Sequence, residues 1–379
     1  MRFGTKAVHA GQRPDLVTGA INVPVYQSAT FIKAEPGSGQ PFEYGRVTNP
    51  TRSALEANLA ALENAEHAVA FSSGVAAADA ILRTLRPGDH VLASRDLYGG
   101  NYRLLTAVHG PAGIPTTFVD MTCTNVVAAA LTPSTRLLWI ETPTNPLLRV
   151  LDIAALSRIA RTQGAEIVVD STFATPYLQQ PLGLGADLVL HSATKYLGGH
   201  SDVIGGVVCT NDDGWAEKLR FQVTCTGAIP GPMDCYLLLR GAKTLHLRVE
   251  RQCASAGRLA AYLQAHEEVR KVYFPGLASS EDHGLARRQM RHFGGMLSFE
   301  LLERRDAERV LMGVRLFKFA ESLGGVESLI GHPATMSHSS LSPQERLSRD
   351  ITDGLVRLSV GVEDVEDLVA DLDQALARM

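Results

Sequence analysis

The chain has 379 residues, of which 45% are hydrophobic and 20% charged, so it is long enough to bury more than one hydrophobic core. Its formal net charge is −4 and it contains no basic run, which argues against a nucleic-acid partner. No stretch approaches ~20 consecutive apolar residues, and the first six residues lack a signal-like apolar core, so we expect a cytoplasmic protein without a membrane partner.

Residues 1–50 contain glycine, proline and few periodic apolar runs. Residues 35–41, Glu-Pro-Gly-Ser-Gly-Gln-Pro, are typical of an exposed loop. We therefore expect an N-terminal arm rather than a folded domain.

Short apolar runs alternate with helix-like segments from residue 51 to residue 234. A helix-like segment lies at 153–160, and the apolar runs lie at 67–71, 90–93, 117–119, 136–141, 166–170 and 188–190. This alternation predicts a large α/β domain with a mostly parallel sheet wrapped by helices.

The pattern changes after residue 232. Residues 237–263 are typical of a long helix, whereas 295–301 and 355–360 alternate like half-buried strands. Residues 362–379 are typical of a terminal amphipathic helix. We expect residues 235–379 to form a smaller α+β domain that closes over the first.

A lysine follows the apolar run 188–190, in the sequence His-Ser-Ala-Thr-Lys. Open α/β sheets bind ligands at the carboxyl ends of their strands, where Ser192 and Thr194 are expected to stand. Hydroxyls suit a phosphate and a lysine amine condenses with an aldehyde, and pyridoxal 5′-phosphate (PLP) offers both groups. We predict that Lys195 binds PLP; the alternative is a solvated lysine after a strand.

Asp170 ends the run 166–170, one strand and one crossover earlier than Lys195. A buried carboxylate beside the pyridine nitrogen favours its protonated form, which lets the cofactor act as an electron sink. An aspartate in this place is also common as a helix N-cap or turn residue. Its combination with the lysine motif is much less common, and it favours the cofactor site.

Two glycine-containing turns complete the predicted cofactor site. Ser73, Gly74 and Val75 open an alanine-rich helix, and the unpaired N–H groups at a helix start bind anions. Tyr98 precedes two glycines and can stack on a flat ring. An ordinary capped helix and a packing tyrosine are the alternatives.

Metal and nucleotide sites have little support in the sequence. The five cysteines are scattered and include no Cys-x-x-Cys pair, which argues against disulfides and zinc. His191 and His200 have no partner at metal-ligand spacing, so we predict no metal. No Gly-x-Gly-x-x-Gly or P-loop motif is present.

Along nearly its whole length, the sequence resembles the Cys/Met-metabolism branch of PLP enzymes, close to cystathionine γ-synthase and γ-lyase. These enzymes have the PLP-dependent transferase fold of type I. The matching segments are Tyr44-Gly-Arg46-Val-Thr-Asn-Pro-Thr51, Ser73-Gly74, Leu97-Tyr-Gly-Gly100, Glu141-Thr-Pro-Thr-Asn-Pro146, Asp170, Ser192-Ala-Thr-Lys-Tyr196, Ala320-Glu-Ser-Leu-Gly-Gly325 and Arg357-Leu-Ser-Val-Gly361.

The resemblance implies roles for the cofactor-site residues. Lys195 forms a Schiff base with PLP, Asp170 pairs with the pyridine nitrogen, and Tyr98 stacks on the ring and assists proton transfer. The phosphate is held by Gly74, Val75, Ser192 and Thr194, with Ser73 nearby. Tyr44 and Arg46 reach the phosphate of a neighbouring subunit, so we expect a homo-oligomer, by resemblance a tetramer, with active sites shared across a dimer interface.

The resemblance also implies a site for amino-acid substrates. Asn145, Ser322 and Arg357 hold the substrate α-carboxylate, for which the planar fork of an arginine is suited. The distal end of the substrate is held by Glu321, by Glu43 of the neighbouring chain and by Arg103. The chain departs from the family at Ser171, commonly Asn, and at residues 223–224, commonly Gln-Asn.

We predict a γ-synthase that joins an O-acylated homoserine and cysteine to form cystathionine, because residues 98–104, 145–150 and 321–330 resemble bacterial γ-synthases. The alternative is a γ-lyase, which cleaves cystathionine to cysteine, 2-oxobutyrate and ammonia. A non-catalytic ligand-binding protein with this fold, as in some transcription factors, would need a DNA-binding segment, whereas the resemblance starts almost at residue 1.

Overall fold

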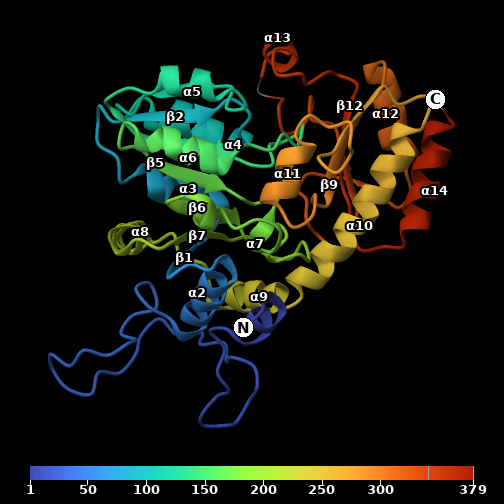
Figure 1. The fold of residues 1–379 in the computed structure, drawn as a ribbon. Helices are drawn as coiled ribbons and strands as arrows, with labels where there is room; N and C mark the ends of the chain where they lie inside the picture. The colour runs from blue at the N-terminus through green and yellow to red at the C-terminus, as the bar shows by residue number, and fades with distance from the viewer. Residues whose placement is uncertain (340, 379) are drawn as a thin grey trace.

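The computed structural model describes residues 1–339 and 341–378, which are arranged around two β-sheets (Figure 1). The seven-stranded sheet contains β1 His67–Phe71, β2 His90–Ser94, β3 Thr116–Val119, β4 Thr135–Glu141, β5 Glu166–Asp170, β6 Leu188–Ser192 and β7 Gly206–Thr210. The five-stranded sheet contains β8 Lys271–Tyr273, β9 Met296–Glu300, β10 Lys318–Phe319, β11 Leu329–Gly331 and β12 Leu355–Ser359.

The larger sheet has the strand order β1-β7-β6-β5-β4-β2-β3. Every neighbouring pair from β6 to β3 is parallel, and only β7 is antiparallel to its neighbours. The predicted α/β class with a mostly parallel sheet is therefore confirmed. Parallel pairing brings the carboxyl ends of β4, β5 and β6 to one edge, where Glu141 is the register partner of Asp170.

Helices connect the strands and cover both faces of the larger sheet (Figure 1). The α-helices are α1 Phe3–His9, α2 Pro50–Glu63, α3 Gly74–Leu82, α4 Gly99–Arg103, α5 Thr124–Ala130, α6 Ile153–Arg161, α7 Thr175–Leu178, α8 Asp213–Thr226, α9 Pro232–Ala242, α10 Leu245–Gln264, α11 His283–Gln289, α12 Arg304–Gly313, α13 Pro343–Leu347 and α14 Val365–Leu376. A π-helix, η1 Leu104–His109, follows α4, and a 3-10 turn, η2, covers Pro181–Leu184. No helix in the described part of the chain is long and apolar enough to cross a membrane.

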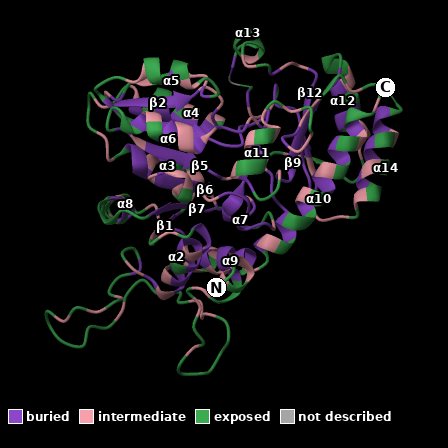
Figure 2. Cartoon of the chain, viewed as in Figure 1, coloured by how far each residue is buried: buried purple, intermediate pink, exposed green. Residues whose placement is uncertain are grey.

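Alternating side chains of the larger sheet belong to two different cores. Figure 2 shows that most of this sheet is buried. In β4, Leu137 and Trp139 belong to the core that includes side chains of α3 and α8, whereas Leu138 and Ile140 belong to the core that includes side chains of α2 and α6. Burying a side chain of this size stabilises the fold by about 1.5–3 kcal/mol. The core that contains Leu138 and Ile140 continues to the smaller sheet and α14, so packed apolar side chains join the two sheets.

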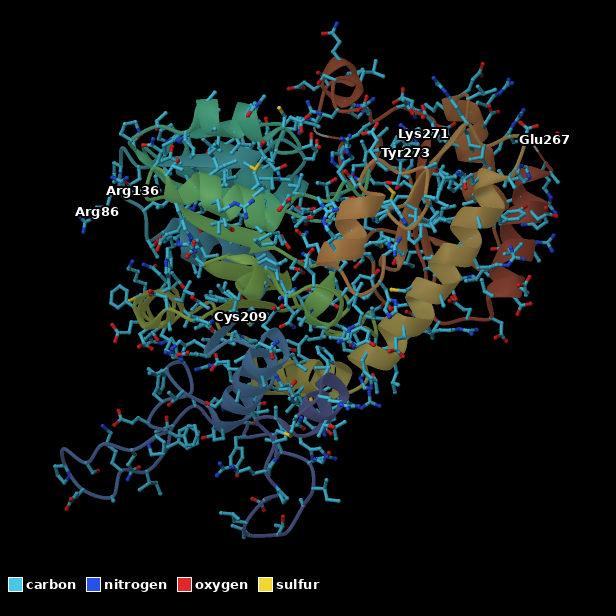
Figure 3. All side chains as sticks on the ribbon, in the orientation of Figure 1. Arg86, Arg136, Cys209, Glu267, Lys271 and Tyr273 are labelled. Carbon is cyan, nitrogen blue, oxygen red and sulfur yellow. The ribbon has the colours of Figure 1, made fainter. Side chains whose placement is uncertain are left out.

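The outer ends and edges of the sheets carry charge. Figure 3 shows Arg86 and Arg136 pointing outward from the larger sheet, whereas Cys209 of β7 lies inside the molecule. Both edge strands of the smaller sheet are short and contain a lysine, Lys271 in β8 and Lys318 in β10. Such edges discourage pairing with another chain.

The predicted long helix at 237–263 is wrong in one respect, because the chain forms two helices there with a break at residues 243–244. At the break, Thr244 leaves the helical backbone conformation, and its N–H and Oγ1 donate to the Gly241 carbonyl at 3.2 and 3.3 Å. The Gly241 carbonyl also accepts a hydrogen bond from Arg248 Nη2 at 2.8 Å. The terminal helix forms as α14, and residue 379 of its predicted range lies outside the described residues.

Residues 1–49 contain one helix, α1, which Asn58 of α2 holds through hydrogen bonds to the carbonyls of Lys6, Ala7 and Ala10. Residues 11–49 form loops that extend from the body (Figure 1). The division into an arm and two domains at residues 50 and 234 stays a prediction.

Candidate active site

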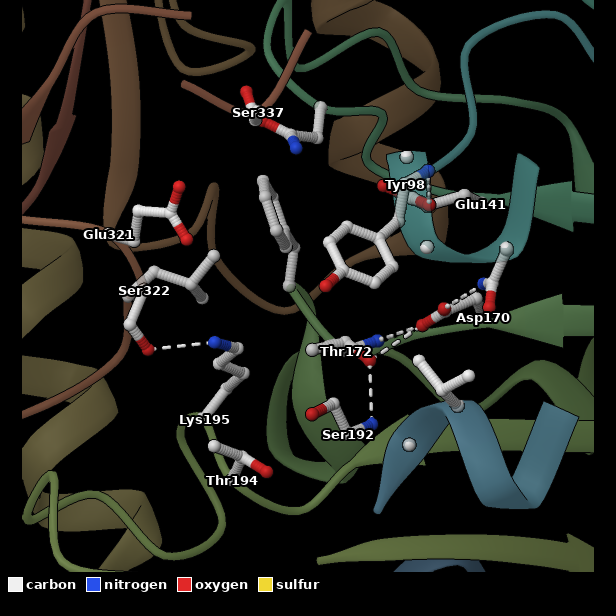
Figure 4. A pocket seen from close by; sticks show the side chains of 18 of the residues that line it. Tyr98, Glu141, Asp170, Thr172, Ser192, Thr194, Lys195, Glu321, Ser322 and Ser337 are labelled. Carbon is white, nitrogen blue, oxygen red and sulfur yellow. Dashed lines mark hydrogen bonds between the residues drawn. The ribbon is translucent and has the colours of Figure 1, made fainter. Parts of the chain in front are cut away.

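A cavity of about 340 Å³ opens at the carboxyl edge of β4, β5 and β6 (Figure 4). The starts of α3 and α4 and residues from the smaller sheet complete its walls. The predicted site residues that line it are Ser73, Gly74, Val75, Tyr98, Arg103, Asn145, Asp170, Ser192, Thr194, Lys195, Glu321, Ser322 and Arg357.

Lys195 follows β6 in a turn, in which its N–H donates to the Ser192 carbonyl at 3.2 Å. The Lys195 Nζ enters the cavity and donates to Ser322 Oγ at 2.7 Å (Figure 4). Burial, helped by the positive charge of Arg357, lowers the pKa of Lys195 to about 8, while Glu321 opposes the shift. More of this amine is therefore neutral and nucleophilic near neutral pH than in an exposed lysine.

Asp170 ends β5 with its carboxylate on the cavity. Its Oδ1 accepts hydrogen bonds from Thr172 N at 3.1 Å and Thr172 Oγ1 at 2.6 Å, and its Oδ2 accepts from Asn101 Nδ2 at 3.4 Å. Burial raises the pKa of Asp170, and the hydrogen bonds from Thr172 oppose this. All three donors are neutral, so a cationic group in the cavity would complement this carboxylate.

The start of α3 approaches the end of β6 closely. A Cβ at Gly74 would lie 2.9 Å from the Cβ of Ser192, so a larger residue would force the two elements apart. Ser73 is the N-cap, and its Oγ accepts from Ala76 N at 3.0 Å. Helix N–H groups and the Ser192 hydroxyl therefore share one corner of the cavity and form a cradle for an anion.

Arg357 of β12 lies on the side of the cavity formed by the smaller sheet. Its Nη1 donates to Asn145 Oδ1 at 2.8 Å and its Nη2 to the Ser322 carbonyl at 3.1 Å. Burial lowers the pKa of Arg357 to about 10, which leaves it charged at neutral pH. The structure thus brings together the three residues predicted to bind a carboxylate.

Three predicted residues lie outside this cavity, and all belong to the arm. Arg46 Nη1 donates to the Thr224 carbonyl, and its guanidinium lies 5.4 Å from the centre of the Tyr44 ring. Glu43 forms an ion pair with Lys33 at 3.1 Å. A single chain therefore does not bring Glu43, Tyr44 or Arg46 to its own cavity.

Glu141, Asn101 and Thr172 also line the cavity, although none of them was among the predicted site residues. Glu141 ends an apolar strand in the same way as Asp170, so the signal that identified Asp170 was present for Glu141 too. Ser171, at a position where Asn is common in the resembled enzymes, is buried, and its Oγ accepts a hydrogen bond from Gln179 Nε2 at 3.3 Å.

PLP fits this donor set. The anion cradle suits its phosphate, Asp170 suits a protonated ring nitrogen, and Lys195 offers an amine of lowered pKa to its aldehyde. These groups come from three neighbouring elements at one sheet edge, and Tyr98 stands above them (Figure 4).

Several known proteins with related sequences or structures are named as cystathionine synthases or lyases. A family profile described as Cys/Met metabolism PLP-dependent enzyme matches residues 4–377. A cystathionine γ-synthase of Mycobacterium tuberculosis is 52% identical over 375 residues, which cover 98% of this chain and 96% of the relative. A cystathionine β-lyase of Coxiella burnetii is 49% identical over 375 residues, which cover 98% of this chain and 97% of the relative.

The solved structure of a cystathionine γ-lyase from Lactobacillus plantarum, in complex with L-serine, superposes with a TM-score of 0.97 at 44% identity, covering 100% of this chain and 99% of that one. These matches confirm the predicted family, fold class and cofactor. The names of the relatives include three activities, of which the β-lyase was not considered in the sequence analysis. The chain is an enzyme, and it belongs to the Cys/Met metabolism PLP-dependent family.

Proposed function

We propose that this enzyme is a cystathionine γ-synthase that joins an O-acylated homoserine to cysteine. The observation that carries the proposal is that Arg103 lines the same cavity as Lys195 and Arg357. Arg357 would bind the α-carboxylate, which leaves Arg103 as a second cation for the anionic arm of an O-succinyl group. The similarity to a relative named cystathionine γ-synthase supports this proposal.

The proposed mechanism begins with the substrate α-carboxylate on Arg357, whose fork is held in place by Asn145 and Ser322. PLP, when bound, supplies an aldehyde for the substrate amine and a ring that withdraws electrons from Cα. Lys195 would then move the proton at Cα, with its amine oriented by Ser322 Oγ. After a Cβ proton is also lost, the Cγ–O bond breaks and the acyloxy group leaves as a carboxylate. The cysteine thiolate forms the new Cγ–S bond, and protons return to Cβ and Cα.

We also propose roles for the cofactor-site residues. Asp170 would pair with the pyridine nitrogen, Tyr98 would stack on the ring, and the phosphate would be held by Gly74, Val75, Ser192 and Thr194. The hydrogen bonds of Asp170 and the close approach of Gly74 to Ser192 support these assignments. Ser73 would act mainly as the N-cap, because its Oγ already accepts from Ala76 N.

The arm supports a shared active site. Several of its apolar side chains are almost fully exposed in the single chain, among them Leu16 (99%), Val17 (92%) and Ile32 (93%). We propose that the arm packs on a second copy and brings Glu43, Tyr44 and Arg46 to the partner's cavity, in a homotetramer built from such dimers.

A cytoplasmic location is part of the same proposal. The five cysteines are free thiols, and two of them, Cys123 and Cys225, are exposed. Exposed thiols persist in a reducing compartment, which supports the cytoplasm.

A γ-lyase is the second candidate because Glu321 also lines the cavity, where it would hold the distal ammonium of cystathionine. The test compares kcat/KM for O-succinylhomoserine with cysteine, O-acetylhomoserine with cysteine, and cystathionine alone. We expect the O-succinyl substrate to give the highest value. If cleavage of cystathionine to 2-oxobutyrate is fastest by a wide margin, the γ-lyase replaces the synthase; pyruvate as the keto product would indicate a β-lyase.

A further inference from the structure

The end of β4 carries a buried carboxylate that the proposed mechanism does not use. Glu141 is 4% exposed, and its neighbour on β5 is Asp170. Because β4 and β5 are parallel, both carboxylates stand at the edge of the sheet where the cavity opens (Figure 4).

Both carboxylates bind the short helix that carries Tyr98 and Arg103. The Tyr98 N–H donates to Glu141 Oε2 at 2.7 Å, at the N-cap of α4. Asn101, two residues into α4, donates to Asp170 Oδ2 at 3.4 Å. α4 continues directly into η1, and these contacts hold the end of that helical segment that faces the cavity.

The Tyr98 ring depends on the backbone of α4 for its place. The residue is 45% exposed, so packing restrains the side chain only in part. A Cβ at Gly100 would lie 2.3 Å from Tyr98 Cε1, which shows how closely the ring follows the α4 backbone. A small shift of α4 would therefore move the ring relative to Lys195 and Asp170.

The charges around Glu141 favour an uncharged acceptor. The pKa of this carboxyl group is raised by the like charges of Asp170 and Asp96 and lowered by the opposite charge of Arg357. Burial, followed by the charge of Asp170, raises the pKa of Glu141 well above its usual range. A neutral carboxyl can still accept the Tyr98 N–H, and an amide oxygen in the same place could do so too.

We propose that Glu141 is a positioning residue, which accepts the Tyr98 N–H and thereby sets where the Tyr98 ring stands over the cofactor. The inference rests on the proposed function, in which Tyr98 stacks on the PLP ring. Glu141 touches neither substrate nor cofactor in this account and acts through α4.

A double-mutant cycle of Glu141→Ala and Tyr98→Ala tests this role in the holoenzyme. The readouts are kcat/KM, the visible circular dichroism of the bound cofactor, and Tm. We expect Glu141→Ala to lower kcat/KM by about 10- to 100-fold and to weaken the visible signal. In a protein that already carries Tyr98→Ala, Glu141→Ala should lower kcat/KM by less than about 3-fold.

Two further variants separate positioning from general stability. Glu141→Gln keeps an acceptor oxygen and should stay within about 3-fold of the parent enzyme. Asp371→Asn is the matched control, because this buried carboxylate of α14 accepts the backbone N–H groups of Arg315, Leu316 and Phe317. It should lower Tm without changing the visible signal. If Glu141→Ala does not fold, Glu141→Asp, which withdraws the carboxylate by one methylene, takes its place in the cycle.

Additive losses in the double variant, or a Glu141→Gln variant as impaired as Glu141→Ala, would overturn the inference. Unchanged kcat/KM and visible signal in Tyr98→Ala alone would overturn the proposed role of Tyr98, and the inference with it. The single variants thus distinguish a failure of the inference from a failure of the proposed function.

Discussion

Lys195 differs from a surface lysine because of where the fold places its amine. Its pKa falls from 10.5 to about 8, first through burial and then through the charge of Arg357. Glu321 acts in the opposite direction, and Ser322 accepts a hydrogen bond from the amine. The residues proposed to bind substrate therefore also adjust the reactivity of the lysine.

This pKa predicts how fast the cofactor-free protein takes up PLP at different pH. The neutral amine attacks the aldehyde, so the rate should rise from pH 7, pass its midpoint near pH 8 and level off above pH 9. Stopped-flow absorbance at a series of pH values measures this profile. Glu321→Gln should lower the midpoint, because Glu321 raises the pKa. A rate that keeps rising to pH 10.5 would show that the amine is not perturbed.

Among the elements, α3 shows how one residue can serve two roles. Ser73 was predicted to lie near the phosphate, and in the structure its Oγ caps the helix through Ala76 N. The cap also holds the first turn of α3, which Gly74 brings against Ser192. Removal of the cap would therefore loosen the anion cradle indirectly.

Ser73→Ala is expected to destabilise the protein by about 1 kcal/mol, which calorimetry would record as a lower Tm. Ser73→Asn, which retains a capping oxygen, should restore most of the loss. An unchanged Tm together with weaker PLP affinity would contradict the capping role and assign the hydroxyl to the phosphate.

The strands could be predicted where burial leaves a local signal. The runs at 67–71 and 166–170 match β1 and β5, because strands buried on both faces need continuous apolar residues. The break between α9 and α10 could not be predicted, since the hydrogen bonds of Thr244 and Arg248 to the Gly241 carbonyl leave no signal in the pattern of apolar residues.

The same contrast holds for the candidate site. Lys195 and Asp170 were predictable because Asp170 ends one recognisable strand and Lys195 follows another. Asn101 and Thr172 donate hydrogen bonds to Asp170. Polar residues of this kind have no sequence pattern that indicates which side chain they will bind. Within the single chain Arg46 donates to the Thr224 carbonyl, so its place at a partner's phosphate site stays a prediction.

At the scale of the whole molecule, the cavity depends on both sheets. Lys195 and Asp170 come from the larger sheet, whereas Arg357 comes from β12 of the smaller one. The hydrogen bond between Arg357 and Asn145 connects the two sides. Relative movement of the sheets would change substrate binding more than the cofactor cradle, because the cradle lies on one side only.

The proposed shared site predicts complementation between two inactive variants. Arg46→Ala would impair the partner's phosphate site and Lys195→Ala the chain's own, so a mixed dimer retains one intact site. Chains refolded together at random should regain about one quarter of the parent activity, whereas either variant alone stays inactive. Full activity in a proven monomer would rule out a shared site.

The most direct test of the account is to locate the cofactor on the chain. Borohydride reduction of the holoenzyme, followed by peptide mass spectrometry, fixes PLP to the lysine that holds it. We predict a single modified lysine, Lys195, and no modification in Lys195→Ala, which should also lack activity. Cofactor on another lysine, or on none, would contradict the assignment of this cavity as the active site.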